Sequence, residues 1–452
     1  MGLVEAPADP SCQLRGIPGG SEARRRAKEG GDAAEGGSCA PATLGAVDAY
    51  LDHAATTPVR PEAFEAMRPW LTTAFGNPSG GHRVARNARR AVDEARDDVA
   101  LALGCEPGEV VFTGGGTEAD NLAVAGVVAA ARRSGRPGGA VCSAIEHHAV
   151  LHSVEAVGGH TVGVDRDGLV DMAALAQVIG PSTAIVSVML ANNEVGTVQD
   201  LVAVASVMAE VAPAAVLHTD AVQAAPWLDV ASLARPAHLV SVAAHKLGGP
   251  QGVGALVVRG GVRLEPLLRG GGQERERRSG THNVAGIVGM AAALRGVVDD
   301  RAQAVGRAIL LRDRLVSSVR AELDGVVETA AGAPRLPSIA HLRIAGVESE
   351  SLLVLLDDAG ICASAGSSCA SGAMAPSHVL AAMGWARADA RSAVRLSVGR
   401  TTTRAEVDGA AHALVGSARR LRATTTPASA SPGTTSRPLN AMRPVTPAPA
   451  RA

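Results

Sequence analysis

The sequence predicts an α/β protein with a large domain around a mostly parallel seven-stranded sheet and a smaller α+β domain near the C-terminus. Two observations lead to this fold class. From residue 109 onward, short β-branched runs alternate with longer stretches rich in alanine and leucine, a pattern typical of parallel sheets built from βαβ crossovers. From about residue 285 the pattern changes to one long helical stretch followed by widely spaced strands.

Seven β-branched runs are the candidate strands of the large sheet. They are Glu109–Phe112, Ala140–Ser143, Thr161–Val164, Ala184–Met189, Ala215–His218, Leu239–Val242 and Gly254–Val258. The smaller domain starts with a helical stretch rich in alanine, valine and arginine. The elements that we expect there are this helix from about Ala285, a strand at Ser338–Arg343, a helix from Glu348, a short strand near Ile361 and a strand at Ala393–Val398.

The two ends of the chain are compositionally biased. Residues 1–47 are rich in glycine, alanine, glutamate, arginine and proline, and residues 423–452 in threonine, proline, alanine and serine. Both predict disorder, and the first can also be an extension from a misassigned start. Between them we expect a large domain at 63–284 and a small domain formed by 48–62 and 285–422.

Composition and charge exclude several classes of protein. The chain is 46% hydrophobic and 19% charged, with a net charge of −1, which argues against a general nucleic-acid binder. It has no apolar run long enough to span a membrane and no signal-peptide pattern. Its six cysteines form no C-x-x-C, which points to a reducing compartment. We therefore expect a cytoplasmic protein that binds neither a membrane nor, directly, a nucleic acid.

Lysine is nearly absent from the chain. Of 43 lysine and arginine residues only Lys28 and Lys246 are lysines, and Lys28 lies in the low-complexity N-terminal stretch. Arginine meets most needs for positive charge, but a Schiff base requires a primary amine that can lose its proton. Lys246 is therefore either a Schiff-base residue or a surface lysine retained by chance.

A glycine-rich turn, Thr113–Gly116, joins the first predicted strand to a helix that we expect to run through about Ala131. Such a turn leaves N–H groups at the helix start free to bind an anion, most often phosphate. The sequence is neither a Walker A motif nor a dinucleotide fingerprint. A purely structural turn is the alternative.

Polar residues also follow two other strands, at Asn192–Glu194 and at Asp220–Gln223. Ligands in open α/β sheets lie outside the carboxyl ends of the strands, so we expect these residues to meet in one crevice. Helix capping is the alternative for Asp220. Beside a Schiff-base lysine, Asp220 would instead keep a pyridine nitrogen protonated.

Histidines follow the strand at Ala140–Ser143. His148 and His152 have helical i, i+4 spacing, but neither an H-E-x-x-H motif nor a third ligand accompanies them, so we expect no metal. His147, at the strand end, suits a ring stacked on a cofactor and a proton carrier.

Two cysteines flank a run of small residues. Cys362, at the expected strand near Ile361, fits a buried structural cysteine. The run after it has nothing apolar to bury, so we expect a mobile loop that exposes Cys369. An exposed thiol on such a loop can reach into a site and carry a group away.

These segments together resemble the cysteine desulfurases of the NifS/IscS type, within the class V aminotransferase-like family of pyridoxal 5'-phosphate (PLP) enzymes. The resemblance covers about residues 50–422 and implies the type I fold of PLP-dependent transferases. Seven segments occur in the family's order: Tyr50–Pro58, Phe75–Ser79, Thr117–Asn121, Asn192–Gly196, His245–Lys246, Arg278–Thr281 and the Cys369 loop.

The resemblance implies roles for the residues that contact the cofactor ring and the substrate. Lys246 holds PLP as a Schiff base, Asp220 pairs with the pyridine nitrogen, and Gln223 bonds the ring hydroxyl. His147 stacks on the ring and helps to move protons. Asn193, which also contacts the cofactor, holds the substrate carboxylate with Arg395.

The phosphate ligands implied by the resemblance are Gly116, Thr117 and His245, joined by Thr281 from the second subunit of a homodimer. The family usually has serine or threonine three residues before the lysine, where this chain has Ala243. The missing hydroxyl contact can be supplied by Ser241 or by water, and it is worth about 1 kcal/mol.

The implied reaction converts L-cysteine to L-alanine and leaves the sulfur as a persulfide on Cys369. The acceptor would be an iron–sulfur scaffold protein or a tRNA-thiolating enzyme. The basic run Arg269–Gly280 predicts a dimer-interface and active-site loop rather than an RNA patch. Alternatives are a class V aminotransferase, a selenocysteine lyase and a non-catalytic scaffold protein.

Overall fold

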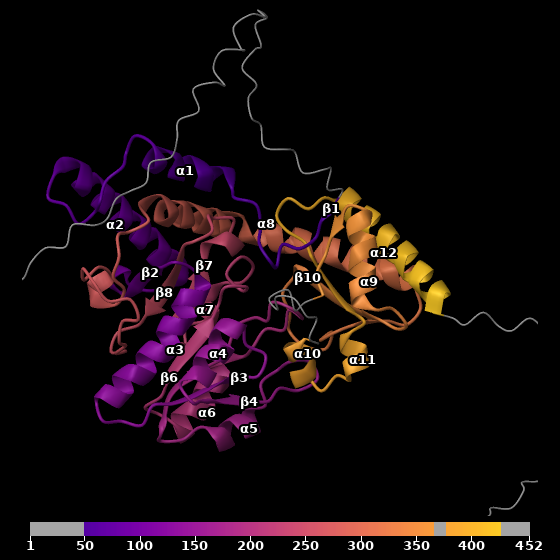
Figure 1. The fold of residues 1–452 in the computed structure, drawn as a ribbon, viewed down its shortest axis with the longest axis horizontal. Coiled ribbons are helices and arrows are strands. Elements are labelled where there is room, and N and C mark those ends of the chain that lie inside the picture. Colours follow the sequence, from indigo (N-terminus) through magenta and orange to yellow (C-terminus); the bar gives the residue numbers. More distant parts are fainter. Residues whose placement is uncertain (1–48, 366–376, 426–452) are drawn as a thin grey trace, which may run out of the picture. The chain divides into compact units, whose positions relative to one another are not determined.

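The computed structural model describes residues 49–365 and 377–425 (Figure 1). Its main element is a seven-stranded sheet in the order β2-β8-β7-β6-β5-β3-β4. Strand β8 is antiparallel to both neighbours, and every other pair is parallel. The strands are β2 Val110–Thr113, β3 Gly139–Ser143, β4 His160–Val162, β5 Thr183–Ser187, β6 Val216–Asp220, β7 Leu239–Ala243 and β8 Gly254–Val258. The mostly parallel sheet is confirmed, with strand ends shifted by one or two residues.

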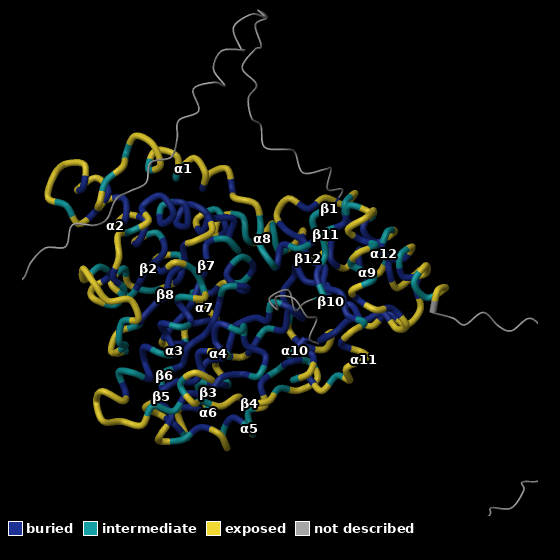
Figure 2. The backbone as a smooth tube through the Cα atoms, viewed as in Figure 1, coloured by how far each residue is buried: buried dark blue, intermediate teal, exposed yellow. Residues whose placement is uncertain are grey.

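Alternation along the strands divides the core into two layers. In β2, Val110 and Phe112 belong to one hydrophobic cluster, while Val111 between them belongs to the other. This is the period of two that a strand buried on both faces requires. Helix α3 (Gly116–Arg133) crosses one face of the sheet and packs on six of its strands. Most strands and the inner sides of the helices are buried, as Figure 2 shows, whereas two of the three residues of edge strand β4 are exposed.

The remaining helices complete the layers. Helix α2 packs on β2 and on α8, which also contacts α1 and α12. The helices are α1 Pro61–Leu71, α2 Arg83–Leu103, α4 His148–Ala156, α5 Met172–Val178, α6 Leu201–Val211, α7 Val230–Leu233, α8 Val284–Glu322, α9 Ser349–Asp358, α10 His378–Ala382, α11 Arg387–Ala390 and α12 Arg404–Thr425. None of the helices that the structure describes is long and apolar enough to cross a lipid bilayer.

A second, antiparallel sheet lies in the C-terminal part. Its order is β12-β10-β9, with β9 Val326–Glu328, β10 Ile339–Ile344 and β12 Ala393–Ser397. The two-residue strands β1 (Ala49–Tyr50) and β11 (Ile361–Cys362) form a parallel pair, and a bridge from Asp52 to Ser397 joins this pair to β12. The N-terminal segment is thereby attached to the C-terminal part. The domain limits expected from the sequence stay a prediction.

Several elements depart from the expectations. Helices α1 and α2 and strands β1 and β9 were not predicted. Cys362 lies on a strand as expected, but its side chain is half-buried rather than buried. Residues 1–48, 366–376 and 426–452 lie outside the described residues, among them Cys369 and nearly all of the two tails expected to be disordered. The C-terminal tail was expected from residue 423, but helix α12 continues through Thr425.

Candidate active site

The carboxyl ends of the central strands border a cavity of about 340 Å³. It gathers most of the residues expected to contact the cofactor and substrate. They are Gly116, Thr117, His147, Asn193, Asp220, Gln223, His245, Lys246 and Arg395. Thr281 does not line this cavity and is exposed, and Cys369 lies outside the described residues. The predicted convergence at one edge of the sheet is therefore observed for all but these two.

Lys246 stands at the end of a short 3-10 turn, Ala244–Lys246, that directly follows β7. Its Nζ donates hydrogen bonds to the carbonyl oxygens of Ala54 and Ala55, at 2.5 and 2.6 Å. These carbonyls come from the segment after β1, so the N-terminal strand positions the amine from across the cavity. This contact joins two segments 190 residues apart that sequence periodicity does not connect.

Two histidines beside the lysine are held neutral. Burial, with the positive charge of Lys246, lowers the pKa of His147 to about 4 and that of His245 to about 4. His147 precedes α4, and its Nδ1 accepts a hydrogen bond from the backbone N–H of Ala149 at 3.1 Å. A neutral imidazole at neutral pH can accept a proton, which is the role expected for His147.

Asp220 ends β6 and is only 6% exposed. Burial raises its pKa to about 6, although the N–H of Val222 and the charge of Lys246 act in the opposite direction. Gln223, one turn further on, is also buried, and its Oε1 has no partner among the described residues. A buried carboxyl and an unpaired amide on one wall fit a pyridine nitrogen and a ring hydroxyl, so the residues present suit PLP.

The glycine turn before α3 forms the second, open part of the site. Gly115 has a φ of 150°, and a Cβ at Gly116 would lie 2.8 Å from a methyl group of Val222, so both positions require glycine. A solvent-open cavity of about 740 Å³ lies in front of this turn and is also lined by Asn121 and His245. N–H groups at a helix start suit a phosphate, so the geometry of this turn is compatible with the phosphate site that the sequence predicts.

One N–H of the turn is already occupied. The carboxylate of Glu118 accepts a hydrogen bond from Gly114 N at 2.7 Å and others from Nε and Nη2 of Arg278, at 2.8 and 3.2 Å. A phosphate would therefore meet the N–H groups after Gly114. The pair was not expected from the sequence, because its members are 160 residues apart.

Ala243 faces this turn without a hydroxyl. Its Cβ lies 3.5 Å from the place where a Cβ on Gly116 would stand. Ser241, two residues earlier, does not fill the gap, because its fully buried Oγ is 2.9 Å from His218 Nε2. Of the two substitutes expected for the missing hydroxyl, the contact with His218 argues against Ser241, and water stays a prediction.

Arg395 reaches the cavity from β12 of the second sheet and is 2% exposed. Its Nη1 donates to the carbonyl oxygen of Asn193 at 2.8 Å, and its Nη2 pairs with Asp52 Oδ1 at 2.7 Å. The Nε atom has no partner among the described residues. A buried guanidinium with an unused donor suits a small carboxylate, which is the predicted role of Arg395.

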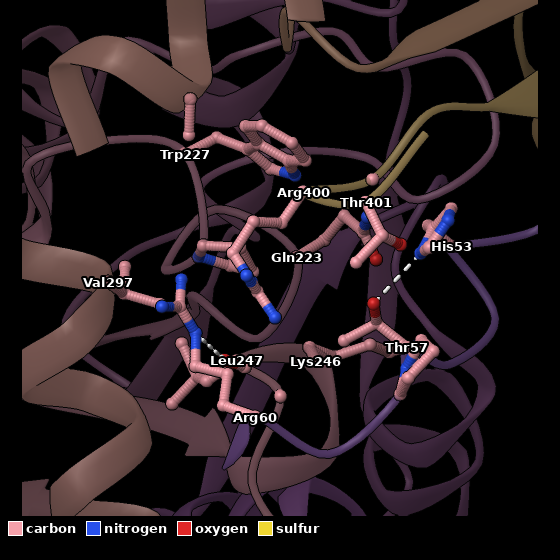
Figure 3. A pocket seen from close by; sticks show the side chains of 15 residues that line it. His53, Thr57, Arg60, Gln223, Trp227, Lys246, Leu247, Val297, Arg400 and Thr401 are labelled. Atoms are coloured by element: carbon pink, nitrogen blue, oxygen red, sulfur yellow. Dashed lines mark hydrogen bonds between the residues drawn. The ribbon is translucent and has the colours of Figure 1, made fainter. Parts of the chain in front are cut away.

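A smaller cavity of about 40 Å³ adjoins the site, and Figure 3 shows its lining. Lys246 and Gln223 line both cavities. Arg60, on the far side, donates from Nε to the carbonyl oxygen of Leu247 at 3.1 Å. This space has room for only a few water molecules.

No group of three or more histidine, cysteine, aspartate or glutamate side chains in the described ranges could hold a metal ion. His148 and His152 do meet, with their rings stacked 5.1 Å apart, and His378 lies 4.5 Å from His148. The spacing of the first two on α4 therefore produces a contact between histidine rings.

A model of the aminotransferase class-V family matches residues 49–409. The chain belongs to this family. It is 47% identical over 385 residues to an IscS-like cysteine desulfurase of Mycobacterium tuberculosis, covering 83% of this chain and 97% of the relative. It is 39% identical over 366 residues to the cysteine desulfurase IscS of Dictyoglomus turgidum, covering 80% and 92%.

Solved structures agree with this placement. A NifS-like protein matches with a TM-score of 0.76 and 33% identity, covering 81% of this chain and 98% of the other. A structure described as SspA in complex with cysteine matches with a TM-score of 0.69 and 29% identity, covering 78% and 100%. The predicted cysteine desulfurase family, fold class and cofactor are thus confirmed: this is a PLP-dependent enzyme.

Proposed function

We propose that the enzyme acts on L-cysteine, releases L-alanine, and transfers the sulfur to its own Cys369. One observation carries this proposal: Lys246 and Asp220, at neighbouring strands of the large sheet, line one cavity with Arg395 from the second sheet. An amine, a ring-nitrogen partner and a carboxylate ligand in one cavity can bind an amino acid on PLP. The family of the chain supports the choice of cysteine.

Each residue has a definite task. Bound PLP supplies an electron sink for the negative charge that develops on the substrate Cα. Arg395 holds the substrate carboxylate, and Asn193, whose carbonyl oxygen accepts from Arg395, fixes the direction of the guanidinium. The Lys246 amine removes the α-proton, and neutral His147 accepts a proton beside it.

The sulfur step uses the Cys369 thiolate. It attacks the substrate sulfur, so a sulfur–sulfur bond forms as the carbon–sulfur bond breaks, and the carbon takes up a proton to give alanine. The electron pair of the broken bond stays with the product carbon. Cys369 thereby becomes a persulfide, and its terminal sulfur must then pass to a second acceptor.

The decisive experiment compares Lys246→Ala, Cys369→Ser and the unmodified enzyme. We expect Lys246→Ala to lose the visible absorbance of bound PLP and all alanine production. Cys369→Ser should keep the absorbance and lose the protein persulfide. Alanine release at the normal rate by Cys369→Ser would overturn the role of Cys369, whereas turnover that requires a keto acid would identify an aminotransferase.

Dimerisation, the acceptor and the compartment belong to the same proposal. The enzyme is a cytoplasmic homodimer in which Thr281 contacts the phosphate of the partner's cofactor, and an iron–sulfur scaffold protein or a tRNA-thiolating enzyme takes the sulfur. The exposure of Thr281 outside its own cavity supports this arrangement.

Subunit mixing tests the shared site. Lys246→Ala and Thr281→Ala homodimers should both be impaired. When the two are mixed, one cavity of each heterodimer carries both defects and the other carries none, so up to half of the normal activity per heterodimer should return. No recovery in verified heterodimers would contradict a Thr281 contribution across the interface.

A further inference from the structure

A second carboxyl group, not assigned from the sequence, lines the cofactor cavity. Asp120, on α3, borders the same cavity as Asp220 and is 1% exposed. Its Oδ1 has no hydrogen-bond partner among the described residues. A buried acid without full pairing has a high energetic cost, so its presence here calls for an explanation.

The surroundings of Asp120 form a buried polar chain beneath the cavity. Three neighbouring strands each direct one polar side chain toward α3: Ser187 from β5, His218 from β6 and Ser241 from β7. His218 Nδ1 is 2.7 Å from Ser187 Oγ, and its Nε2 is 2.9 Å from Ser241 Oγ. Ser241 bonds the Asp120 carboxyl, and His218 Nε2 lies 3.6 Å from Asp120 Oδ1.

None of the three side chains Ser187, His218 and Ser241 supplies a positive charge that could neutralise an ionised Asp120. Burial lowers the pKa of His218 to about 3, so its imidazole is neutral. Burial, with the negative charge of Asp220 and of Glu146, raises the pKa of Asp120 well above its usual value, although the hydrogen bond from Ser241 acts in the opposite direction. Lys246, the cation that acts on this group of acids, favours ionisation of Asp220.

We propose that Asp120 is a positioning residue that remains a protonated acid, so that the Asp120–Asp220 pair carries one negative charge, located on Asp220. Two carboxyl groups in one buried site cannot both ionise cheaply. The Ser241–His218–Ser187 chain fixes the neutral acid in place, and Asp220 alone offers its charge to the ring nitrogen. This inference rests on the proposed pairing of Asp220 with that nitrogen.

The test uses the PLP-loaded Cys369→Ser enzyme and follows the visible band of the cofactor as a function of pH. Asp120→Asn replaces the protonated acid by a neutral group of the same shape. The pH at the midpoint of the change in the visible band should therefore stay within about 0.3 pH units of the unmodified value. Asp120→Leu removes the polar neighbour of Asp220 and favours its protonated form. The ring nitrogen then loses its positive charge, and the midpoint should move up by about one unit.

Two companion variants keep the test decisive if Asp120→Leu does not fold. Ser241→Ala removes a hydroxyl bond that favours ionised Asp120, so the acid should stay protonated and the midpoint should stay close to the unmodified value. Glu155→Gln, an exposed acid on α4, controls for the loss of a charge and should change nothing. A downward shift in Asp120→Asn would show that Asp120 is ionised and would overturn the inference.

Infrared difference spectroscopy gives a readout independent of the cofactor band. A protonated buried carboxyl has a carbonyl stretch. Glu146 is also buried with a raised pKa, so the stretch of Asp120 is the component that Asp120→Asn should abolish and that both Glu146→Gln and Glu155→Gln should keep. Persistence of that stretch in Asp120→Asn would also overturn the inference. Neither measurement needs L-cysteine or an acceptor, so a wrong substrate assignment would leave both results interpretable.

Discussion

The cofactor site has two regions with opposite physical character. The buried wall, formed by Asp120, Asp220, Gln223 and Arg395, consists of charged or polar side chains that are at most 6% exposed. The phosphate turn, residues 114–118, presents backbone N–H groups to a cavity open to solvent. Water and salt screen charges at the turn, whereas the wall has little such screening. A single substitution should therefore reduce activity, stability or affinity far more in the wall than at the turn.

The largest effect should follow Asp220→Asn in the buried wall. The amide keeps the shape of the side chain but removes the negative charge that holds the ring nitrogen protonated. We expect kcat to fall roughly a hundred- to a thousandfold, the usual cost of removing one preorganised electrostatic group. Steady-state assays of alanine formation measure this.

Asp229→Asn is the matched control, because Asp229 also follows β6 and is exposed. Its kcat should be unchanged. If Asp220→Asn lost no more activity than Asp229→Asn, the claim that substitutions in the buried wall strongly reduce activity would be wrong.

A buried support behind the phosphate turn should give the next largest effect, on stability. Glu274 accepts four hydrogen bonds, two from Arg96 at 2.7 and 2.8 Å, one from His282 at 2.7 Å and one from Phe112 N at 2.9 Å. Despite the cost of burial, these contacts lower its pKa to about 2. Glu274 lies four residues before Arg278, so it supports the loop that pairs with the turn.

A lowered folded-state pKa fixes the sign of the pH effect. The contribution of Glu274, roughly 3 kcal/mol, is full above its unfolded pKa near 4.5 and is lost as the pH falls toward about 2. Glu274→Gln should therefore unfold at lower urea than the unmodified protein at pH 7 and show a weaker loss of stability between pH 5 and pH 2. Glu276→Gln, exposed on the same turn, should match the unmodified protein; equal behaviour of both variants would disprove the assignment.

Strand periodicity predicted the large sheet well because its strands are buried on both faces. Their β-branched runs stand out against the alanine-rich helices, and all seven lie within a few residues of the expected positions. Strands β1 and β11 have two residues each, too few to show a period. Their pairing depends on contacts some 310 residues apart, which local pattern does not encode.

The residues of the site also divide into those that the sequence could predict and those that it could not. Residues at strand ends, such as Asp220 and His147, were predictable because a parallel sheet brings those ends together. Asp120 was missed because it lies inside a helix, where an acid is normally taken for a solvated residue. Its position in Thr117–Asn121, directly after the glycine turn, was the available signal. The roles of all these residues stay predictions until variants are measured.

Arg395→Lys probes whether the buried wall recognises geometry or only charge. Lysine keeps the positive charge but cannot bond Asp52 and Asn193 while also offering a planar donor pair to a carboxylate. We expect the KM for L-cysteine to rise roughly tenfold with a smaller change in kcat. Arg391→Lys, an exposed arginine before β12, is the control; a KM that rose equally in both would disprove recognition by the geometry of the Arg395 guanidinium.

The smallest effect should come from Ala243→Ser. Ala243 is buried, as the residues of the wall are, yet it faces the phosphate turn. The new hydroxyl can donate to the phosphate in place of water, with a net gain of about 1 kcal/mol, so the Kd for PLP should fall about fivefold. Equilibrium titration of the apoenzyme by cofactor fluorescence measures this. Ala243→Cys adds a group of similar size whose thiol is a weak donor, and it should bind PLP no tighter than the unmodified enzyme. If the serine and cysteine variants bound PLP equally well, the gain would come from filling space, and the missing hydroxyl would carry no energetic weight at this turn.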